Sequence, residues 1–486
     1  MNEITDRMKK YLFFLSAVSM AMFTACSSGD DLAAVPELTQ AEKDAAIIAE
    51  AISPSDVQIR LGMGSQSSSN EVTRAPLESE SDGLFTTPTG QYLGIFCLAQ
   101  QNQTTTGALP VGSVATNAID WSSTDADTKF FLMAQNQAAK VVKKGPGGTL
   151  GNVTLGTGVY ASEVQFMNGA LDDTQIYYYP YGNWYNYYFY GYYPRQTTGI
   201  NYASGKITVD FAINGTQDII HGTAKPATAD LATGFNAKYI RTKQTEHNGV
   251  NILEDLPQLA MDHKLTQVRF WVKTTSSNYT TYGYGTGQTD KKFRITELKL
   301  TQVPTNWTLT VADKATSNNA EGQLMPQTNL GLSDITPKVM ALLGDGKTAD
   351  PANTSDAEAL ANAIDIPLNN AQLVGYAMIP TTEMMALDAV TITDRTDKTV
   401  PYFDFTISYT DASNNASTFE FKNQKITLPT QTVGTAEVQG LLANRVYNVI
   451  IDVPVPEEID MTATLEQWAT VTVTETSPQN ISVNVD

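Results

Sequence analysis

Short segments in which apolar and polar side chains alternate recur along most of this 486-residue chain. In one of them, residues 207–213, a single face carries Ile207, Val209, Phe211 and Ile213. A period of two residues is typical of a β-strand with one buried face. We expect further strands at residues 57–63, 92–98, 187–193, 265–272, 293–300, 372–379, 402–409, 418–421, 447–453 and 469–473. Many short strands with turns between them predict a mainly β chain of two β-sandwiches, with short helices in the loops.

Charge and cysteine content exclude several classes of function. The formal net charge is −20, whereas nucleic acid and anionic lipid require a basic face on their partner. The two cysteines are Cys26, in the leader, and Cys97. The folded part therefore has a single thiol, which rules out an internal disulfide and a cysteine-based zinc site. We expect Cys97 to be a buried free thiol.

Motifs of catalysis are missing from the sequence. His221, His247 and His263 lie far apart, and there is no nucleophile, zinc or phosphate-binding motif. The acidic pair Asp125 and Asp127 lacks the further oxygen ligands of a calcium loop. We therefore expect no enzyme activity, cofactor or metal. Two separated carboxylates of a β-sandwich glycosidase would leave no local signature, so that alternative stays open at this point.

The first 25 residues have the organisation of a targeting signal. A basic region with Arg7, Lys9 and Lys10 precedes apolar residues 11–23, which are too few to span a bilayer. The segment ends in Phe23, Thr24, Ala25 and Cys26 and resembles the lipobox of bacterial lipoproteins. This resemblance implies cleavage before Cys26, its acylation, including palmitate, and export as an outer-membrane lipoprotein. A secretory signal without a lipid is the alternative.

Residues 56–76 combine a strand, a polar loop and a lone arginine. In the strand, the alternating apolar side chains are those of Val57, Ile59, Leu61 and Met63. Residues 65–70 are small and polar, which predicts an exposed loop, and Arg74 and Ala75 follow. An arginine in a flexible loop suits an Arg-specific protease, because cleavage needs an unfolded segment. Taken alone, this stretch favours the simpler interpretation of an edge strand followed by a loop.

Residues 177–194 form an unusually aromatic run, YYYPYGNWYNYYFYGYYP. Aromatic side chains there could stack on sugar rings or contact a protein partner, since tyrosine favours both. A hairpin, with a turn at residues 180–183 and a strand at residues 187–193, is favoured by β propensity. The first part of the run remains a candidate ligand patch with Tyr181, Trp184 and Tyr185.

Several segments together resemble the fimbrillin family, the subunits of type V pili in Gram-negative anaerobes, which includes fimbrillin-like surface lipoproteins. They are residues 189–194 (FYGYYP), 217–222 (QDIIHG), 263–268 (HKLTQV), 441–447 (LLANRVY) and 466–468 (EQW). Another segment with small and acidic residues, 27–31, resembles the surface-export signal that follows a lipidated cysteine. A capping box at Thr39 to Glu42 predicts a short helix in the tether that follows.

The resemblance implies two transthyretin-like β-sandwich domains and maturation by an Arg-specific protease that cuts after Arg74. The lost placeholder strand would be the one carrying Val57, Ile59, Leu61 and Met63. A C-terminal donor strand of the next subunit, with Ile481, Val483 and Val485 on one face, would fill the groove. The implied division begins with a signal peptide (residues 1–25) and a propeptide (26–74). An N-terminal domain (75–305) and a C-terminal domain (306–486) follow, and the donor strand (479–486) is the end of the latter.

These features predict a structural or adhesive pilus subunit. It would be held at the outer membrane by its lipid before cleavage and would lie in an extracellular fimbrium afterwards. The expected partners are other pilus subunits, and a glycan or protein of a host or bacterial surface. The alternative is a monomeric glycan-binding lipoprotein that uses the aromatic patch.

Overall fold

Strands dominate the chain, which confirms the predicted mainly β class. The computed structural model describes residues 39–40, 42–43, 54–63, 86–101, 135–145, 147–150, 153–154, 161–180, 185–203, 205–225, 235–246, 256–276, 279, 293–313, 318–337, 342–343, 347–348, 364–393, 395, 397–410, 416–428, 430–433, 436–453 and 470–475. Within these residues, no helix is long and apolar enough to cross a membrane.

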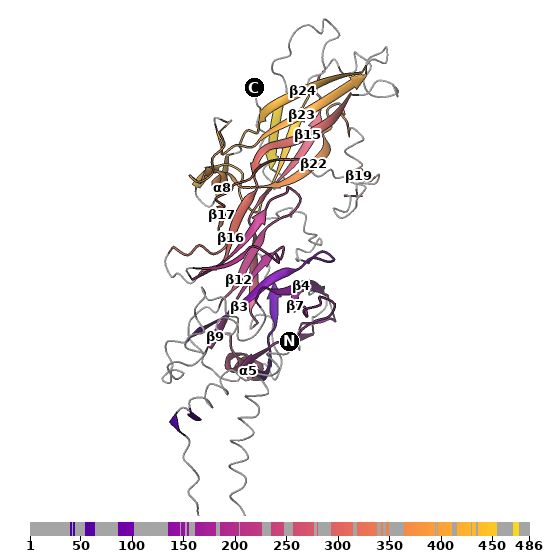
Figure 1. Cartoon of the computed structure of the whole chain (residues 1–486). Helices are drawn as coiled ribbons and strands as arrows, with labels where there is room; N and C mark the ends of the chain where they lie inside the picture. Colours follow the sequence, from indigo (N-terminus) through magenta and orange to yellow (C-terminus); the bar gives the residue numbers. More distant parts are fainter. Residues whose placement is uncertain are drawn as a thin grey trace, which may run out of the picture.

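Seven strands close into a barrel at the lower end of the molecule in Figure 1, in the order β12-β13-β2-β7-β4-β3-β9. Neighbours run antiparallel, except that β2 is parallel to β13. The bounds are β2 (Leu61–Met63), β3 (Leu93–Gln101), β4 (Gln137–Lys144), β7 (Ala161–Phe166), β9 (Tyr185–Tyr193), β12 (Ile220–Ala224) and β13 (Gln258–His263).

A four-stranded sheet adjoins the barrel and consists of β10 (Ile200–Ala203), β11 (Lys206–Ala212), β16 (Asn306–Asp313) and β17 (Leu324–Pro326). Strand β3 is buried on both faces between them. Its side chains Ile95 and Cys97 belong to the barrel core, whereas Phe96 and Leu98 pack in a second core with residues of β11. A strand buried on both faces reads as a continuous apolar run, as residues 92–98 do.

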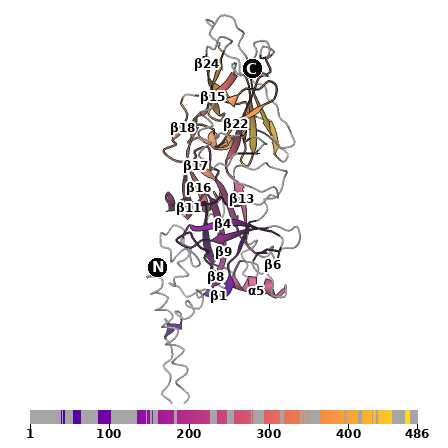
Figure 2. The same cartoon turned by 90° about the vertical axis from the view of Figure 1, so that its right-hand side faces the viewer.

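Two further sheets form a sandwich at the opposite end of the elongated molecule (Figures 1 and 2). One contains β22 (Gln372–Ile379), β14 (Thr266–Lys273), β27 (Val446–Asp452) and β28 (Thr470–Glu475). The other contains β18 (Leu332–Ile335), β15 (Phe293–Pro304), β23 (Tyr402–Thr410) and β24 (Ala416–Lys425), with β21 (Ile364–Asp365) on β15. The rings of Phe270 and Phe403 meet between the sheets, with centroids 5.5 Å apart. The β-sandwich expectation is confirmed here.

The sheets do not divide the chain at residues 305 and 306, where the sequence placed a domain boundary. Strands β14 and β15 precede that point, yet they pair with β22, β27 and β23 of the sandwich. Strand β16 follows it and pairs with β11 beside the barrel. The boundary was expected there because the sequence has polar loops around it. The pairing of these strands instead depends on residues about 100 or more positions away in the chain, which loop composition does not indicate.

Shorter elements complete the described part. They are helices α5 (Ala237–Glu246) and α8 (Thr382–Ala386) and the pairs β1 (Pro54–Gln58) with β8 (Tyr178–Pro180), β5 (Thr149–Leu150) with β6 (Val153–Thr154), β19 (Leu342–Leu343) with β20 (Lys347–Thr348), and β25 (Thr430–Val433) with β26 (Ala436–Gln439). The predicted capping box is confirmed: Thr39 N donates to Glu42 Oε2 at 2.8 Å, and Glu42 N donates to Thr39 Oγ1 at 3.3 Å.

Candidate functional site

The N-terminal strand β2 is a central strand of the barrel. It pairs with β7 through Leu61, Gly62 and Met63, and with β13 through the last two of these. In addition, Gly62 N donates a hydrogen bond of 3.0 Å to Pro257 O. Strands β7 and β13 have no ladder with each other, so β2 alone joins them in the barrel path. Without β2 the barrel would have an open seam.

The alternating side chains of this segment are all in the barrel core. Val57, Ile59, Leu61 and Met63 are at most 8% exposed and pack in one cluster with residues of β3, β7, β9 and β13. The apolar face that the sequence predicts for these residues is therefore buried, and their role as a placeholder strand stays a prediction. At about 1.5–3 kcal/mol for each side chain, this burial contributes up to about 12 kcal/mol to the docking of the segment.

Strand β1, which precedes β2 in the same segment, pairs with a different neighbour, β8. Ser55 Oγ donates to Tyr179 O at 2.6 Å, and Ile59 N donates to Tyr177 O at 2.8 Å. The Tyr179 side chain lies in the same core, and its hydroxyl has no hydrogen-bond partner in the described residues. Burial raises the pKa of Tyr179 well above its usual value. The first part of residues 54–63 thus pairs with β8, and the last part pairs with β7 and β13.

Gly62 lies beneath a polar side chain of β13. A Cβ atom at this position would come within 2.2 Å of Gln258 Oε1. The glycine therefore allows Gln258 to lie across the middle of β2, where the ladder is only three residues long. A side chain at residue 62 would have to displace the end of Gln258.

Helix α5 packs against the start of the segment and was missed in the sequence. Asn236 caps it, because its Oδ1 accepts a hydrogen bond of 2.9 Å from Tyr239 N. Ala237 and Ile240 are buried in the core that holds β2. Asp56 of β1 pairs with Arg241 of the helix, and the hydrogen bond from Arg241 lowers the pKa of Asp56. The asparagine before Ala237 and the spacing of Ala237 and Ile240 were the available signal.

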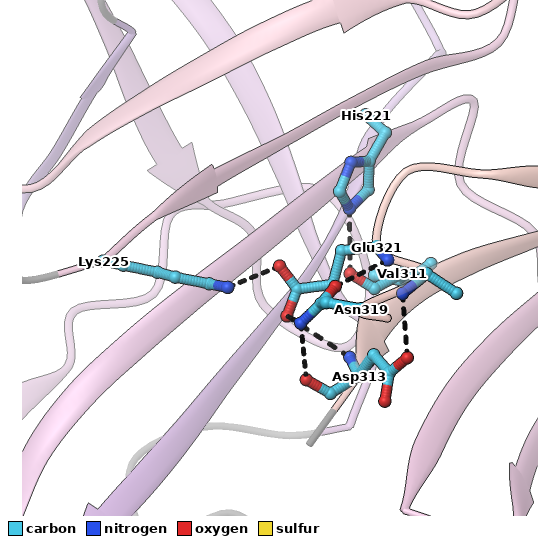
Figure 3. Close-up of polar contacts among 7 residues, drawn as sticks. His221, Lys225, Val311, Asp313, Asn319 and Glu321 are labelled. Atoms are coloured by element: carbon cyan, nitrogen blue, oxygen red, sulfur yellow. Dashed lines mark hydrogen bonds and ion pairs between the residues drawn. The ribbon is translucent and has the colours of Figure 1, made fainter. Parts of the chain in front are cut away.

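A polar cluster holds the barrel to the adjoining sheet (Figure 3). His221 Nε2 donates to Val311 O at 2.8 Å, and Lys225 pairs with Glu321. Asp313 pairs with Lys206 at 3.3 Å and accepts a hydrogen bond of 2.9 Å from the backbone N of residue 320. Each charged group here has a protein partner, so the cluster is structural. The described part of the chain contains no group of three His, Cys, Asp or Glu side chains placed to hold a metal ion.

Replacing His221 with glutamine is expected to weaken the pH dependence of stability between about pH 6.5 and 4. Burial lowers the pKa of His221 to about 4, whereas an unfolded histidine has a pKa of about 6.5. The unfolded state therefore binds more protons in this range, and the free energy of unfolding falls with falling pH by up to about 3 kcal/mol. Urea unfolding at both pH values measures this. An identical pH dependence in the two proteins would contradict the assignment.

Most of the other predicted site residues lie outside the described residues. These are Cys26, Arg74, Ala75, Ile481, Val483, Val485, Tyr181 and Trp184. Cys97 is described and is 1% exposed, which confirms the buried free thiol, and burial raises its pKa. The placeholder, lipidation, cleavage and donor assignments therefore stay predictions.

The aromatic run is largely part of the core. Tyr179, Tyr187, Tyr190, Tyr192 and Tyr193 are at most 2% exposed. The strand predicted at residues 187–193 is confirmed as part of β9, but it pairs with β3 and β12 and does not form a hairpin with β8. Tyr185 begins β9 and pairs with the last residue of β3. A patch built on the whole run is therefore excluded, since its described second half packs inside the molecule.

Comparison with known proteins gave likenesses in structure. No family model matches the chain, and no curated protein matches it in sequence. A fimbrial protein from Bacteroides vulgatus is 13% identical, with a TM-score of 0.38 over 86% of this chain and 98% of that chain. A proposed cell adhesion protein from Bacteroides uniformis is 11% identical, with a TM-score of 0.34 over 86% of this chain and 97% of that chain.

A third likeness is to the fimbrial anchor protein Mfa2 from Porphyromonas gingivalis. It is 7% identical, with a TM-score of 0.25 over 87% of this chain and 99% of that chain. TM-scores this low do not transfer a function to this chain.

Proposed function

We propose that the chain is the precursor of a structural or adhesive pilus subunit that assembles by strand exchange. The observation that supports this most directly is the position of β2. A strand from the N-terminal part of the chain lies between β7 and β13 and closes the barrel, with Leu61 only 1% exposed.

Strand β2 is suited to removal after folding. Its ladder with β7 has three residue pairs and its ladder with β13 has two. Both neighbours keep a second partner without it, since β7 pairs with β4 and β13 pairs with β12. Loss of β2 would therefore leave a folded barrel with two free strand edges and an uncovered apolar core. Free edges and apolar surface are what an added strand from another chain covers.

The chain order links cleavage to release. Cys26 and β2 both precede Arg74, so a cut after Arg74 would separate the lipid and the placeholder strand from the rest of the subunit together. The precursor is then an outer-membrane lipoprotein at the cell surface, and the cleaved subunit joins an extracellular fimbrium. The donor is residues 479–486 of the next subunit, whose Ile481, Val483 and Val485 match the alternation of the lost strand.

Replacing Arg74 with alanine is expected to abolish assembly while leaving the fold unchanged. A trace of Arg-specific protease should cut the wild-type precursor after Arg74 and give SDS-resistant or laddered oligomers. Arg74→Ala should remain monomeric and uncut at this position. Mass spectrometry locates the cut, and gel electrophoresis with size-exclusion chromatography measures the assembly.

Arg241→Ala is the matched control. Its guanidinium pairs with the exposed Asp56, so its loss should change stability little and should leave cleavage after Arg74 and assembly intact. A wild-type chain that is cut after Arg74 and stays monomeric would contradict the proposal. Binding of that monomer to a glycan array would then favour the glycan-binding lipoprotein.

A further inference from the structure

A cavity of about 290 Å³ lies far from β2 in the sequence, where four segments meet, one of them at Ala443 in the turn before β27. The turn between β13 and β14 contributes Lys264. The turn before β17 and β17 itself contribute Gly322, Leu324 and Met325, and helix α8 contributes Met384. The volume is just below the usual range for small-molecule sites, about 300–1,000 Å³. A single small ligand would fill it.

Lys264 brings an unpaired cation to this cavity. Its ammonium has no ion pair or hydrogen bond with the described residues, although it is partly buried. Burial lowers the pKa of Lys264, while the charge of Asp262 acts in the opposite direction. A partly desolvated ammonium that makes no hydrogen bond or ion pair with the described residues favours an anion within reach.

Gly322 makes room for that ammonium. Its φ is +73°, in the left-handed region, and a Cβ atom there would lie 2.9 Å from Lys264 Nζ and 2.9 Å from His221 Nδ1. His221 uses Nε2 to donate to Val311 O, so the neutral ring has no proton on Nδ1. The imidazole therefore adds no second positive charge at neutral pH, and one anionic group suits the site.

Apolar side chains make up one part of the cavity wall, beside the polar residues Gln323 and Thr381. Leu324 and Met384 are buried, whereas Met325 is 44% exposed at the rim and is uncovered by the described residues. Glu383 also lines the cavity and has an exposed side chain. Its carboxylate would repel a ligand with several negative charges. The combination favours a single carboxylate on an aliphatic body.

We propose that this cavity binds a small aliphatic monocarboxylate. The carboxylate pairs with Lys264 beside Gly322, and the aliphatic body packs against Leu324, Met325 and Met384. Nothing in this site involves β2 or the cleavage at Arg74, so the inference does not depend on the proposed assembly.

Isothermal titration calorimetry of the folded chain with octanoate tests the site, with octylamine and octanol as ligands of the same length. Octanoate is expected to bind at least tenfold more tightly than either. Lys264→Met should weaken octanoate binding at least tenfold, whereas Lys238→Met, which removes the same charge from the exposed face of α5, should not change it.

A second variant tests the site independently in case Lys264→Met does not fold. Met325→Glu adds a carboxylate at an exposed rim position and should also weaken octanoate binding at least tenfold, with an unchanged thermal midpoint. Equal octanoate binding by the wild type and either pocket variant overturns the proposal. So does the absence of octanoate binding to the wild type at millimolar concentration.

Discussion

A precursor whose β2 is joined to β7 by a disulfide is expected to be cut after Arg74 without assembling. Met63 and Ser162 are register partners on these antiparallel strands, and both side chains are buried. Cross-strand partners have Cα atoms about 4.5–5.5 Å apart, within the range of about 4.4–6.8 Å that a disulfide bridges. The double variant Met63→Cys with Ser162→Cys should therefore hold the strand in the barrel after the backbone has been cut.

The measurement separates cleavage from strand release. On a non-reducing gel the N-terminal fragment should stay attached after proteolysis, and oligomers should appear only when a reductant is added. Met63→Cys alone is the control and should assemble with or without reductant, because it lacks the cross-link. Cys26 is replaced by serine in both proteins, and Cys97 is buried and does not compete. Oligomers that form with the disulfide intact would mean that β2 does not have to leave, and would falsify strand exchange at this seam.

Leu61→Ala is expected to destabilise the precursor by about 2–5 kcal/mol and to leave the assembled form unchanged. Leu61 is 1% exposed in the barrel core, and its truncation leaves a cavity in a packed environment. In the assembled form the strand that carries residue 61 has been released, so its sequence no longer matters. Denaturant unfolding of the uncut precursor and of the oligomers measures the two effects.

Leu98→Ala provides the comparison for this experiment. Leu98 lies on β3, is also fully buried, and stays in the subunit after a cut at Arg74. It should destabilise the precursor and the oligomers alike, because its surroundings persist in both. An equal loss of stability in both forms for Leu61→Ala as well would indicate that the segment is retained and is simply part of the mature core.

Local patterns predicted a large part of this structure. The alternation of Ile207, Val209 and Phe211 gave the buried face of β11, and the apolar run at residues 92–98 became β3, buried on both sides. The capping box at Thr39 has the predicted hydrogen bonds. Such features depend on neighbours within a few residues, so their physical cause is present in the sequence itself.

Pairing over long distances could not be predicted in the same way. The parallel ladder between β2 and β13 joins Gly62 to Gln258, and β15 pairs with β23 on the far side of the boundary expected at residues 305 and 306. Alternation shows which face of a strand is buried, but it does not identify the strand that pairs with it. The cavity at Lys264 was missed for the same reason, because its walls come from four distant segments.

The sequence by itself determined that residues 57–63 are extended with one apolar face, since side chains of extended chain alternate whatever lies beside it. The single strand expected there is divided in the structure, between β1, which ends at Gln58, and β2, which begins at Leu61. The sequence could not decide between an edge strand and a central one. The tertiary structure placed β2 between β7 and β13 and buried Val57, Ile59, Leu61 and Met63 in the barrel core. Only long-range backbone pairing distinguishes these alternatives, because an edge strand and a central strand differ in how many neighbours they pair with.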